Sequence, residues 1–257
     1  SNGEKHTSDI VVIGMGYVGL TLSIALCKKG FGITGVEINK EVVNQLNKGK
    51  AHFHEKKIDA HLSSYIDSKK LVITNSLEDT DSRIFILSVG TPLNEKDGKI
   101  NTSYIKKSLK EIGKIMKPGS LVILRSTVPV GTSRNIAIPI LEKFSGLKCG
   151  ESFFLSFAPE RTIEGKALEE LETNSQIIGG FDEESVSKTY NIFRKLTSTI
   201  VTVSNLESAE MIKIMDNSYR DVIFAYSNEI ALVSETFGLD VLELIQAANT
   251  HYPRNNI

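Results

Sequence analysis

Residues 9–37 read DIVVIGMGYVGLTLSIALCKKGFGITGVE, a pattern typical of a strand, a glycine-rich turn, a helix and a second strand. Ile10 to Ile13 form an apolar, β-branched run of the kind that a buried parallel strand requires. Gly14, Gly16 and Gly19 follow with the spacing G-x-G-x-x-G. Strand, turn, helix and second strand together predict a βαβ unit with a phosphate-binding turn.

Each glycine of this turn has a separate task in a dinucleotide site. The first allows the tight turn, the second lets the backbone approach a pyrophosphate, and the third lets the helix pack close to the strand. Glu37 ends the second strand, about 20 residues beyond the glycines, where a carboxylate binds the ribose hydroxyls of NAD and disfavours the 2′-phosphate of NADP. The turn therefore predicts NAD as the cofactor. The pyrophosphate would lie at the start of the helix, against Gly14, Gly16, Tyr17, Val18 and Gly19.

The overall composition argues against several other classes of protein. The 257 residues carry 30 Lys and Arg and 31 Asp and Glu, a net charge of −1, so nothing indicates nucleic acid or an anionic membrane as a partner. Residues 10–27 carry no charge and are about long enough for a membrane anchor. The glycines, Thr21 and Ser23 make them a poor spanning helix, and no basic cluster precedes them.

The cysteines and histidines predict neither a disulfide framework nor a metal site. Cys27 and Cys149 lack metal-like spacing and indicate a reducing compartment, the cytoplasm. His52 and His54 are close together but are not accompanied by the cysteines or the cluster of acids that a metal would need.

The sequence divides into three segments. Residues 1–8, SNGEKHTS, are polar and are typical of a tag or a disordered leader. Residues 9–203 are the predicted Rossmann-type NAD-binding domain, an α/β fold with a doubly wound, mostly parallel sheet of roughly eight strands. Residues 204–257 are a predicted central helical region that links domains or forms a dimer interface.

Three loops follow apolar runs that predict strands of this sheet, at residues 84–89, 121–124 and 153–157. Because ligands bind outside the carboxyl ends of the strands in such sheets, we expect these loops to border a cofactor or substrate. We favour a contact with ligand for Thr127. For Thr132 the role stays open, because Thr132 or Ser133 could instead cap the next helix. The expected contacts are Val89, Gly90, Thr91, Ser126, Thr127, Thr132, Glu160 and Arg161.

A long uninterrupted helix is predicted from Asn205 to Phe237. The span contains no Gly or Pro, Gly238 ends it, and Ser204 with Glu207 has the spacing of a capping box. Its length would be on the order of 50 Å, and it has more than one apolar face. We therefore expect a homodimer through residues 205–237.

Lys213 and Asn217 lie four residues apart on this helix and share one face. Taken alone, the pair is more typical of a solvated polar stripe than of an active site.

Five motifs in order resemble those of the nucleotide-sugar 6-dehydrogenases, the family of the UDP-glucose and UDP-N-acetylhexosamine dehydrogenases. The resemblance covers essentially all of the chain from Ile10 to Ile257. It implies that the C6 alcohol of a UDP-sugar is oxidised to a carboxylate with two NAD per sugar, in the synthesis of polysaccharide precursors. The motifs are the glycine turn at 14–19, SVGTP at 88–92, STVPVGT at 126–132, APER at 158–161, and the Lys213 and Asn217 pair.

The resemblance also implies roles for particular residues. Lys213 and Asn217 would stabilise the developing alkoxide or oxyanion, as preorganised cationic and amide donors do. Glu160 would act as an acid or base, or would order the water that hydrolyses a thioester. Thr127 would position that water or the sugar. The expected substrate contacts are Glu160, Arg161, Lys213 and Asn217.

One motif of the family is missing. The family's nucleophilic cysteine lies in a Gly-Gly-x-Cys-x-Pro-Lys-Asp segment, soon after a segment resembling Tyr252 to Arg254, and this sequence stops at Ile257. Neither Cys27 nor Cys149 matches that motif. We therefore expect a fragment of a longer enzyme, without the UDP-binding C-terminal domain, that binds NAD but does not complete the four-electron oxidation.

The residue after the Pro-Glu pair of APER bears on the choice of sugar. Members that take UDP-glucose tend to carry Phe there, whereas this chain has Arg161, followed by Gly165, Glu170 and Leu171, which resembles the acetamido-sugar enzymes. We therefore favour UDP-N-acetylmannosamine or UDP-N-acetylglucosamine over UDP-glucose.

Two other functions share parts of this pattern. A 3-hydroxyacid or 6-phosphogluconate type dehydrogenase also has a Rossmann domain, a long helix and a Lys and Asn pair four apart, but APER and STVPVGT argue against it. A non-enzymatic, NAD-sensing module would need no chemistry at Lys213.

Overall fold

The computed structural model describes residues 6–96, 98–254 and 257. Residues 1–5 of the predicted leader lie outside this range. His6–Thr7 instead form a short strand, β1, which pairs in parallel with Thr80–Asp81 (β5). Residues 6–7 of the predicted leader thus lie against the backbone of residues 80–81.

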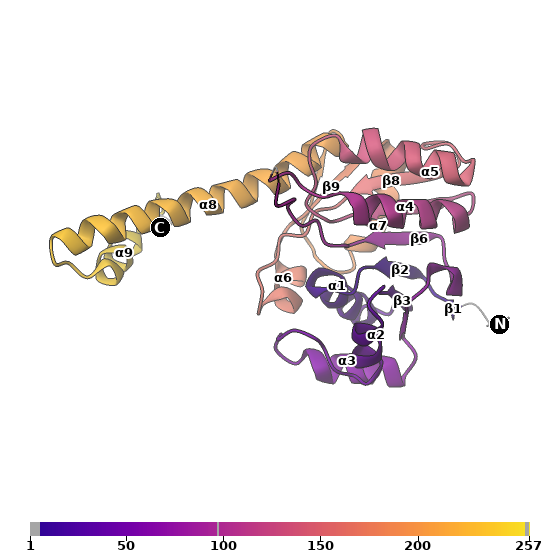
Figure 1. Cartoon of the computed structure of the whole chain (residues 1–257), viewed down its shortest axis with the longest axis horizontal. Coiled ribbons are helices and arrows are strands. Elements are labelled where there is room, and N and C mark those ends of the chain that lie inside the picture. Colours follow the sequence, from indigo (N-terminus) through magenta and orange to yellow (C-terminus); the bar gives the residue numbers. More distant parts are fainter. Residues whose placement is uncertain (1–5, 97, 255–256) are drawn as a thin grey trace. The chain divides into compact units, whose positions relative to one another are not determined.

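An eight-stranded sheet forms the centre of the larger part of the chain (Figure 1). Its spatial order is β10, β9, β8, β7, β6, β2, β3, β4. The central strands are buried on both faces, which explains why they are continuous apolar runs. The strands are Ile10–Ile13 (β2), Ile33–Val36 (β3), Leu71–Thr74 (β4), Ile84–Leu87 (β6), Ser120–Leu124 (β7), Phe153–Phe157 (β8), Gln176–Gly180 (β9) and Ile200–Val203 (β10).

The order of strands reverses at β2. This strand pairs in parallel with β3 on one side and with β6 on the other. Such a reversal is the switch point of a doubly wound sheet, where connections leave to opposite faces and open a crevice at the carboxyl ends of the strands. The α/β Rossmann-type fold predicted from the sequence is confirmed.

The sheet is not parallel throughout. β8 and β9 are antiparallel, through the pairs Ser156 with Gly180 and Phe157 with Gly179, and β10 is parallel to β9. Between β8 and β9 lies only one short helix, Ala167–Thr173 (α6), about 10 Å long, which does not carry the chain back along the sheet. β9 therefore begins at the end of the sheet at which β8 finishes, and runs in the opposite direction.

Helices surround the sheet (Figure 1). The first, Tyr17–Lys28 (α1), is buried along nearly its whole length, from Gly19 to Cys27. The uncharged run that ends at Cys27 therefore reflects a covered core helix. Among the described residues, no helix is both long enough and apolar enough to cross a membrane. The others are Lys40–Asn47 (α2), Ile58–Asp67 (α3), Ser103–Ile115 (α4), Ile138–Ser145 (α5) and Glu183–Phe193 (α7), with short helical turns at Leu77–Asp79 (η1) and Ser133–Ala137 (η2).

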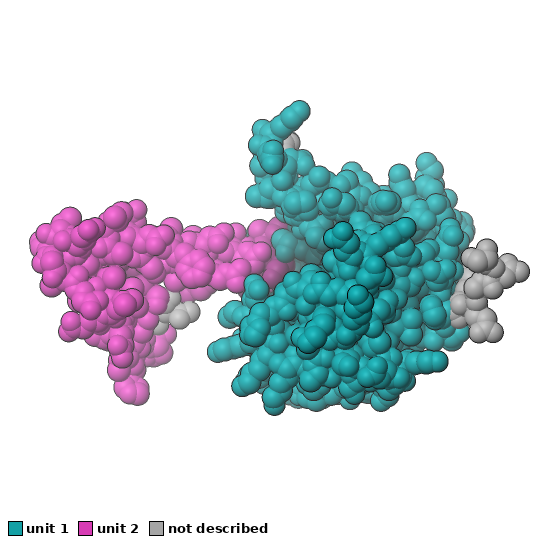
Figure 2. Space-filling view, turned by 60° about the horizontal axis from the view of Figure 1, so that its bottom comes forward, with its two compact units in different colours: residues 1–211 teal, residues 212–257 magenta. Residues whose placement is uncertain are grey.

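The chain forms two compact units, which divide between Met211 and Ile212 (Figure 2). Leu206–Thr236 (α8) begins in the first unit and continues into the second, which also contains Val241–Asn249 (α9). Its 31 residues correspond to about 46 Å. The predicted capping box is wrong: the side chain of Asn205 accepts the N–H of Ser208 at 2.8 Å.

The described residues of the second unit form no apolar core of their own. None of its described apolar residues is buried, and many are more than half exposed. The most exposed are Val222 at 63%, Phe237 at 73% and Leu242 at 74%. These side chains form an apolar surface along α8 and α9.

Candidate functional site

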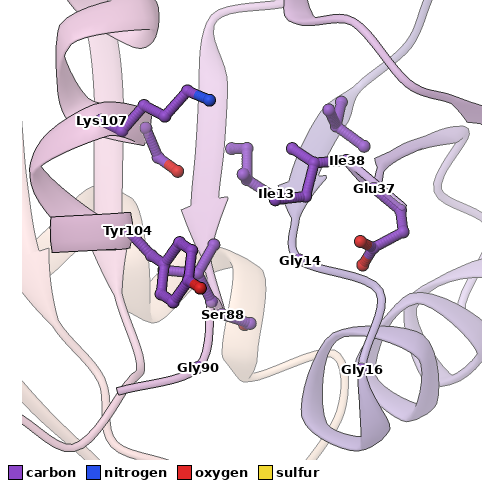
Figure 3. Close-up of a pocket in the computed structure, with 12 residues that line it drawn as sticks. Ile13, Gly14, Gly16, Glu37, Ile38, Ser88, Gly90, Tyr104 and Lys107 are labelled. Atoms are coloured by element: carbon purple, nitrogen blue, oxygen red, sulfur yellow. The ribbon is translucent and has the colours of Figure 1, made fainter. Parts of the chain in front are cut away.

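A cavity of about 250 Å³ lies at the switch point of the sheet, beside the glycine turn (Figure 3). Figure 3 shows Glu37 and Ile38 on one side of this cavity and Tyr104 and Lys107 of α4 on the other. The two α4 residues could not be predicted from the sequence, because exposed positions of an amphipathic helix are usually only a solvated face. The lining residues are Ile13, Gly14, Gly16, Val36, Glu37, Ile38, Ser88, Val89, Gly90, Tyr104, Lys107 and Ser108.

Two glycines of the turn are required by the fold. Gly14 has a φ of +89°, and a Cβ there would lie 2.8 Å from the carbonyl oxygen of Ser88. A Cβ on Gly19 would lie 1.8 Å from the carbonyl oxygen of Gly14. Gly16 differs, because a Cβ at this position would meet nothing within 4 Å. The space beside Gly16 is therefore open to a ligand.

The start of α1 offers a site for an anion. Gly16 is the N-cap residue, and among the described residues no side chain caps this end and no acid lies in the first turn. The N–H groups and the positive end of the helix dipole therefore remain available to a phosphate. Ser88, which lines the cavity, has a buried hydroxyl oxygen without a hydrogen-bond partner among the described residues. An open cradle and an unsatisfied hydroxyl fit a bound dinucleotide.

Glu37 is held in place at the end of β3. Its carboxylate accepts the backbone N–H of Met15 at 3.1 Å and that of Asn39 at 3.0 Å. A carboxylate has about four acceptor positions, so two remain for the hydroxyls of a ribose. The side chain lines the cavity, and its selection of NAD over NADP stays a prediction.

The loops after β6 and β7 are joined by two hydrogen bonds. Thr91 Oγ1 donates to the carbonyl oxygen of Thr127 at 2.9 Å, and Ser126 Oγ donates to that of Val89 at 2.7 Å. These hydroxyls thus hold the two loops together. Direct contacts of Thr91, Ser126 and Thr127 with a cofactor stay predictions.

The helical turn η2 is capped by a residue far away in the sequence. Glu210 of α8 is fully buried, and its carboxylate accepts the N–H groups of Gly131 at 2.6 Å and Ser133 at 2.7 Å. Thr132 instead donates its hydroxyl to the carbonyl oxygen of Pro129 at 2.6 Å. Capping by Thr132 or Ser133, one of the two alternatives, is therefore wrong, and a contact of Thr132 with the cofactor stays a prediction.

Glu160 forms a buried ion pair with Arg125. Arg125 Nη2 donates to Glu160 Oε2 at 2.8 Å, and the N–H of Thr162 donates to Oε1 at 2.6 Å. Burial alone would raise the pKa of Glu160, but the charge and hydrogen bonds of Arg125 and the bond from Thr162 outweigh it and lower the pKa below its ordinary value. Glu160 is therefore a carboxylate at neutral pH.

Arg125 was not predicted as part of the site. It follows β7, is 1% exposed, and its guanidinium lies 5.0 Å from the centre of the Phe193 ring. Nη1 also donates to the carbonyl oxygen of Ala158 and to Gln176 Oε1, both at 3.0 Å. The signal in the sequence was an arginine directly after the apolar run 121–124, where an unpaired charge would be costly.

Arg161 lies next to this pair on the APER loop. Its Nη1 donates to the hydroxyl oxygen of Ser175 at 3.1 Å, just before β9. The antiparallel start of β9 thus supplies partners to both arginines of the loop region, Gln176 for Arg125 and Ser175 for Arg161.

Lys213 and Asn217 lie one turn apart on α8, and both are half-buried. They belong to the second unit, whereas Glu160 and Thr127 belong to the first. Their predicted contact with substrate stays a prediction.

Neither cysteine is a reactive thiolate. Burial raises the pKa of both the Cys27 and the Cys149 thiol to about 12, so both are protonated at neutral pH. Within the part of the chain that the structure describes, no group of three His, Cys, Asp or Glu side chains is arranged to hold a metal ion.

Comparison with known protein families gives two adjacent matches. Residues 8–197 match the UDP-glucose/GDP-mannose dehydrogenase family, NAD binding domain. Residues 207–256 match the central domain of the same family.

The similar proteins include dehydrogenases of UDP-N-acetyl-D-mannosamine. A UDP-N-acetyl-D-mannosamine dehydrogenase of Pyrococcus horikoshii is 38% identical over 249 residues, which are 96% of this chain and 59% of that protein. One of Campylobacter jejuni is 35% identical and is covered to 62%. A solved structure of the Pyrococcus horikoshii UDP-D-ManNAc dehydrogenase superposes with a TM-score of 0.90 at 37% identity, over 97% of this chain and 59% of that one. This chain thus spans about three fifths of the length of these relatives.

Proposed function

Because this chain belongs to the UDP-glucose/GDP-mannose dehydrogenase family, we propose that the protein oxidises the C6 alcohol of a UDP-N-acetylhexosamine to the uronic acid, with two NAD per sugar. UDP-N-acetylmannosamine is the first choice of substrate and UDP-N-acetylglucosamine the second. Such an acid would serve as a polysaccharide precursor made in the cytoplasm.

The position of Arg161 supports the choice of an acetamido sugar as substrate. Arg161 follows Glu160 directly and is half-buried beside the ion pair. The similar proteins named above act on UDP-N-acetyl-D-mannosamine. An arginine at this position supplies hydrogen-bond donors that could read an acetamido carbonyl oxygen, which a Phe could not.

The residues around the cavity fit NAD. The open space at Gly16 and the uncapped start of α1 would bind the pyrophosphate, and Glu37 would bind the adenosine ribose. When bound, NAD supplies the acceptor for a hydride from the sugar. The lining residues of this cavity would hold it.

Glu160 would act in its ionised form. Because Arg125 keeps its pKa low, the carboxylate is suited to accept a proton or to orient a water molecule, and not to donate a proton as an acid. Of the roles that the family resemblance allowed, water ordering or base catalysis is therefore favoured. Thr127, on the loop after β7, would position the water or the sugar.

The oxyanion would be stabilised by Lys213 and Asn217, whose donors share one face of α8. The nucleophilic cysteine would lie outside this sequence, because Cys27 and Cys149 are buried and protonated. We further propose a homodimer in which the apolar surface of α8 and α9 is covered by a second copy.

The test is NADH production by the enzyme in its full length, with UDP-glucose, UDP-N-acetylglucosamine and UDP-N-acetylmannosamine supplied separately. With UDP-N-acetylmannosamine we expect two NADH per sugar. With UDP-glucose we expect a much lower rate of NADH production. A preference for UDP-glucose would overturn the role given to Arg161. One NADH per turnover would overturn the two-step oxidation.

A further inference from the structure

The loop from Arg161 to Lys166, which continues the APER motif, is held by carboxylates from three places in the chain. Three of its backbone N–H groups donate to them, each at a short distance. The pairs are Thr162 N with Glu160 Oε1 at 2.6 Å, Ile163 N with Glu170 Oε2 at 2.7 Å, and Gly165 N with Glu55 Oε2 at 2.9 Å.

Glu55 differs from the other two carboxylates. Glu160 and Glu170 flank the loop in sequence, whereas Glu55 lies 110 residues away from Gly165, before α3. It is 4% exposed, and the same oxygen, Oε2, accepts the hydroxyl of Tyr17 at 2.6 Å. One buried carboxylate thus contacts both the loop and the first residue of α1.

Tyr17 closes this network. Its hydroxyl oxygen accepts the N–H of Gly165 at 2.9 Å and lies 3.2 Å from the carbonyl oxygen of Ile163. Its ring packs edge-on against Phe53, with 4.9 Å between ring centres. Burial and the bond to Glu55 raise the pKa of Tyr17, so the hydroxyl remains a proton donor over the whole working range of pH.

The position of Tyr17 gives the network its consequence. Tyr17 directly follows Gly16, so its backbone N–H belongs to the uncapped start of α1, while its side chain holds the loop. When the Arg161–Lys166 loop is bonded to its side chain, Tyr17 is held in one conformation. Its backbone N–H is then in a fixed position for a dinucleotide. Two events that favour the same state of one residue are coupled, and the coupling is reciprocal.

We propose that Glu55 is a positioning residue, which ties the Arg161–Lys166 loop to Tyr17 so that dinucleotide binding at the glycine turn and ordering of this loop favour each other. The inference rests on the proposed NAD site. Glu55 is 4% exposed and does not line the cavity beside the glycine turn, so its effect on the dinucleotide would be exerted through Tyr17. Its effect is to have the loop beside Glu160 in place once the cofactor is bound.

The test uses this chain and two measurements. Calorimetry gives the affinity for NAD, and limited trypsin digestion, which cuts after Lys166 and Arg161, gives the opening of the loop with and without NAD. In the wild type we expect NAD to slow cleavage after Lys166 at least about fivefold, the lower end of typical coupling between sites. Cleavage of a locally opened loop follows its open population when reclosing is fast.

The variants separate coupling from general stability. Tyr17→Phe and Glu55→Ala should lose this protection and weaken NAD binding by the same factor, as reciprocity requires. Glu55→Gln, which keeps an acceptor for Tyr17 and Gly165, should retain most of both. Tyr65→Phe and Glu151→Gln, which lie outside the network, should behave as the wild type.

The possible outcomes distinguish this inference from the proposed function. If the wild type binds NAD but the loop is cut equally fast with and without it, or equally protected in Glu55→Ala, the coupling is wrong and the NAD site stands. A variant that only lowers the thermal midpoint and keeps the protection factor contradicts it in the same way. If the wild type does not bind NAD, the proposed function fails as well.

Discussion

Arg125 and Glu160 form an ion pair of 2.8 Å in which the two side chains are 1% and 9% exposed. The pair joins the end of β7 to the APER loop, and Arg125 also bonds Gln176 at the start of β9. Removing two charges from water is costly, so such a pair is stable only as long as both partners are present. The geometry of the candidate site therefore depends on a residue outside the APER motif.

Replacing Arg125 by Met should destabilise the chain strongly. The change leaves the Glu160 carboxylate buried without its cation, which costs about 3–5 kcal/mol. Urea unfolding measures the loss. Lys28→Met breaks the exposed Lys28 and Glu172 pair and should cost at most about 1 kcal/mol. Equal effects of the two variants would contradict the special role of the buried pair.

The stability contributed by Glu160 should depend on pH. Its pKa in the folded chain lies below the unfolded value of about 4.3. The contribution is therefore fully present above about pH 4.3 and is lost as the pH falls through the folded pKa. We expect the difference in unfolding free energy between the wild type and Glu160→Gln to be largest near pH 7 and to shrink below about pH 4. A constant difference between pH 7 and pH 3 would be inconsistent with a lowered pKa.

Two glycines of the same turn should respond in opposite ways to replacement by Ala. Gly19→Ala places a Cβ against the carbonyl of Gly14 and should cost at least about 1–3 kcal/mol in unfolding free energy. Gly16→Ala meets open space, so it should change stability by less than about 0.5 kcal/mol but weaken NAD binding. Thermal unfolding and calorimetry with NAD measure both. Unchanged affinity in Gly16→Ala would argue against a pyrophosphate at this place.

Glu37 should make the chain prefer NAD to NADP. Hydrogen bonds to a charged acceptor contribute about 1.5–3 kcal/mol, so Glu37→Gln should lose on the order of tenfold or more in NAD affinity. The difference in affinity between NAD and NADP should become smaller in this variant. Calorimetry with both dinucleotides tests this. Asp79→Asn, a change of charge away from the cavity lining, serves as the control. Equal affinity of the wild type for NAD and NADP would remove the role given to Glu37.

The apolar surface of the second unit should make the chain a dimer. Sedimentation velocity at micromolar concentration should show this dimer, and Val222→Asp should shift it to monomer, because a charge would replace a side chain that is 63% exposed in the single chain. Asn228→Asp adds the same charge at an exposed polar position of α8 and should leave the dimer intact. A monomeric wild type would contradict the proposed interface.

Local patterns predicted most elements of this fold, because they depend on neighbours in sequence. The glycine turn and the strand β2 follow from residues within a few positions of each other. Apart from the cap of α8 by Asn205, the contacts that could not be predicted join distant segments. Glu210 caps η2 from 77 residues away, and Glu55 holds Gly165 from 110 residues away.

The direction of β9 was also missed for a physical reason. Its apolar sequence suits a parallel or an antiparallel neighbour equally well, and only the short helix α6 before it indicates the return. Arg125 shows the same limit. The charge could be seen after β7, but its partners Glu160 and Gln176 lie 35 and 51 residues further along the chain.

The antiparallel contact of β8 with β9 is also the shortest in the sheet, with two residue pairs where β7 and β8 share five. Native-state amide exchange should therefore find a cooperative unit formed by β9, α7 and β10 that opens before the rest of the sheet. Such an opening would remove Gln176 from Arg125 while Glu160 stays bonded to it. The candidate site would then lose Gln176 without global unfolding. A protease could cleave this open form in a chain that is still largely native.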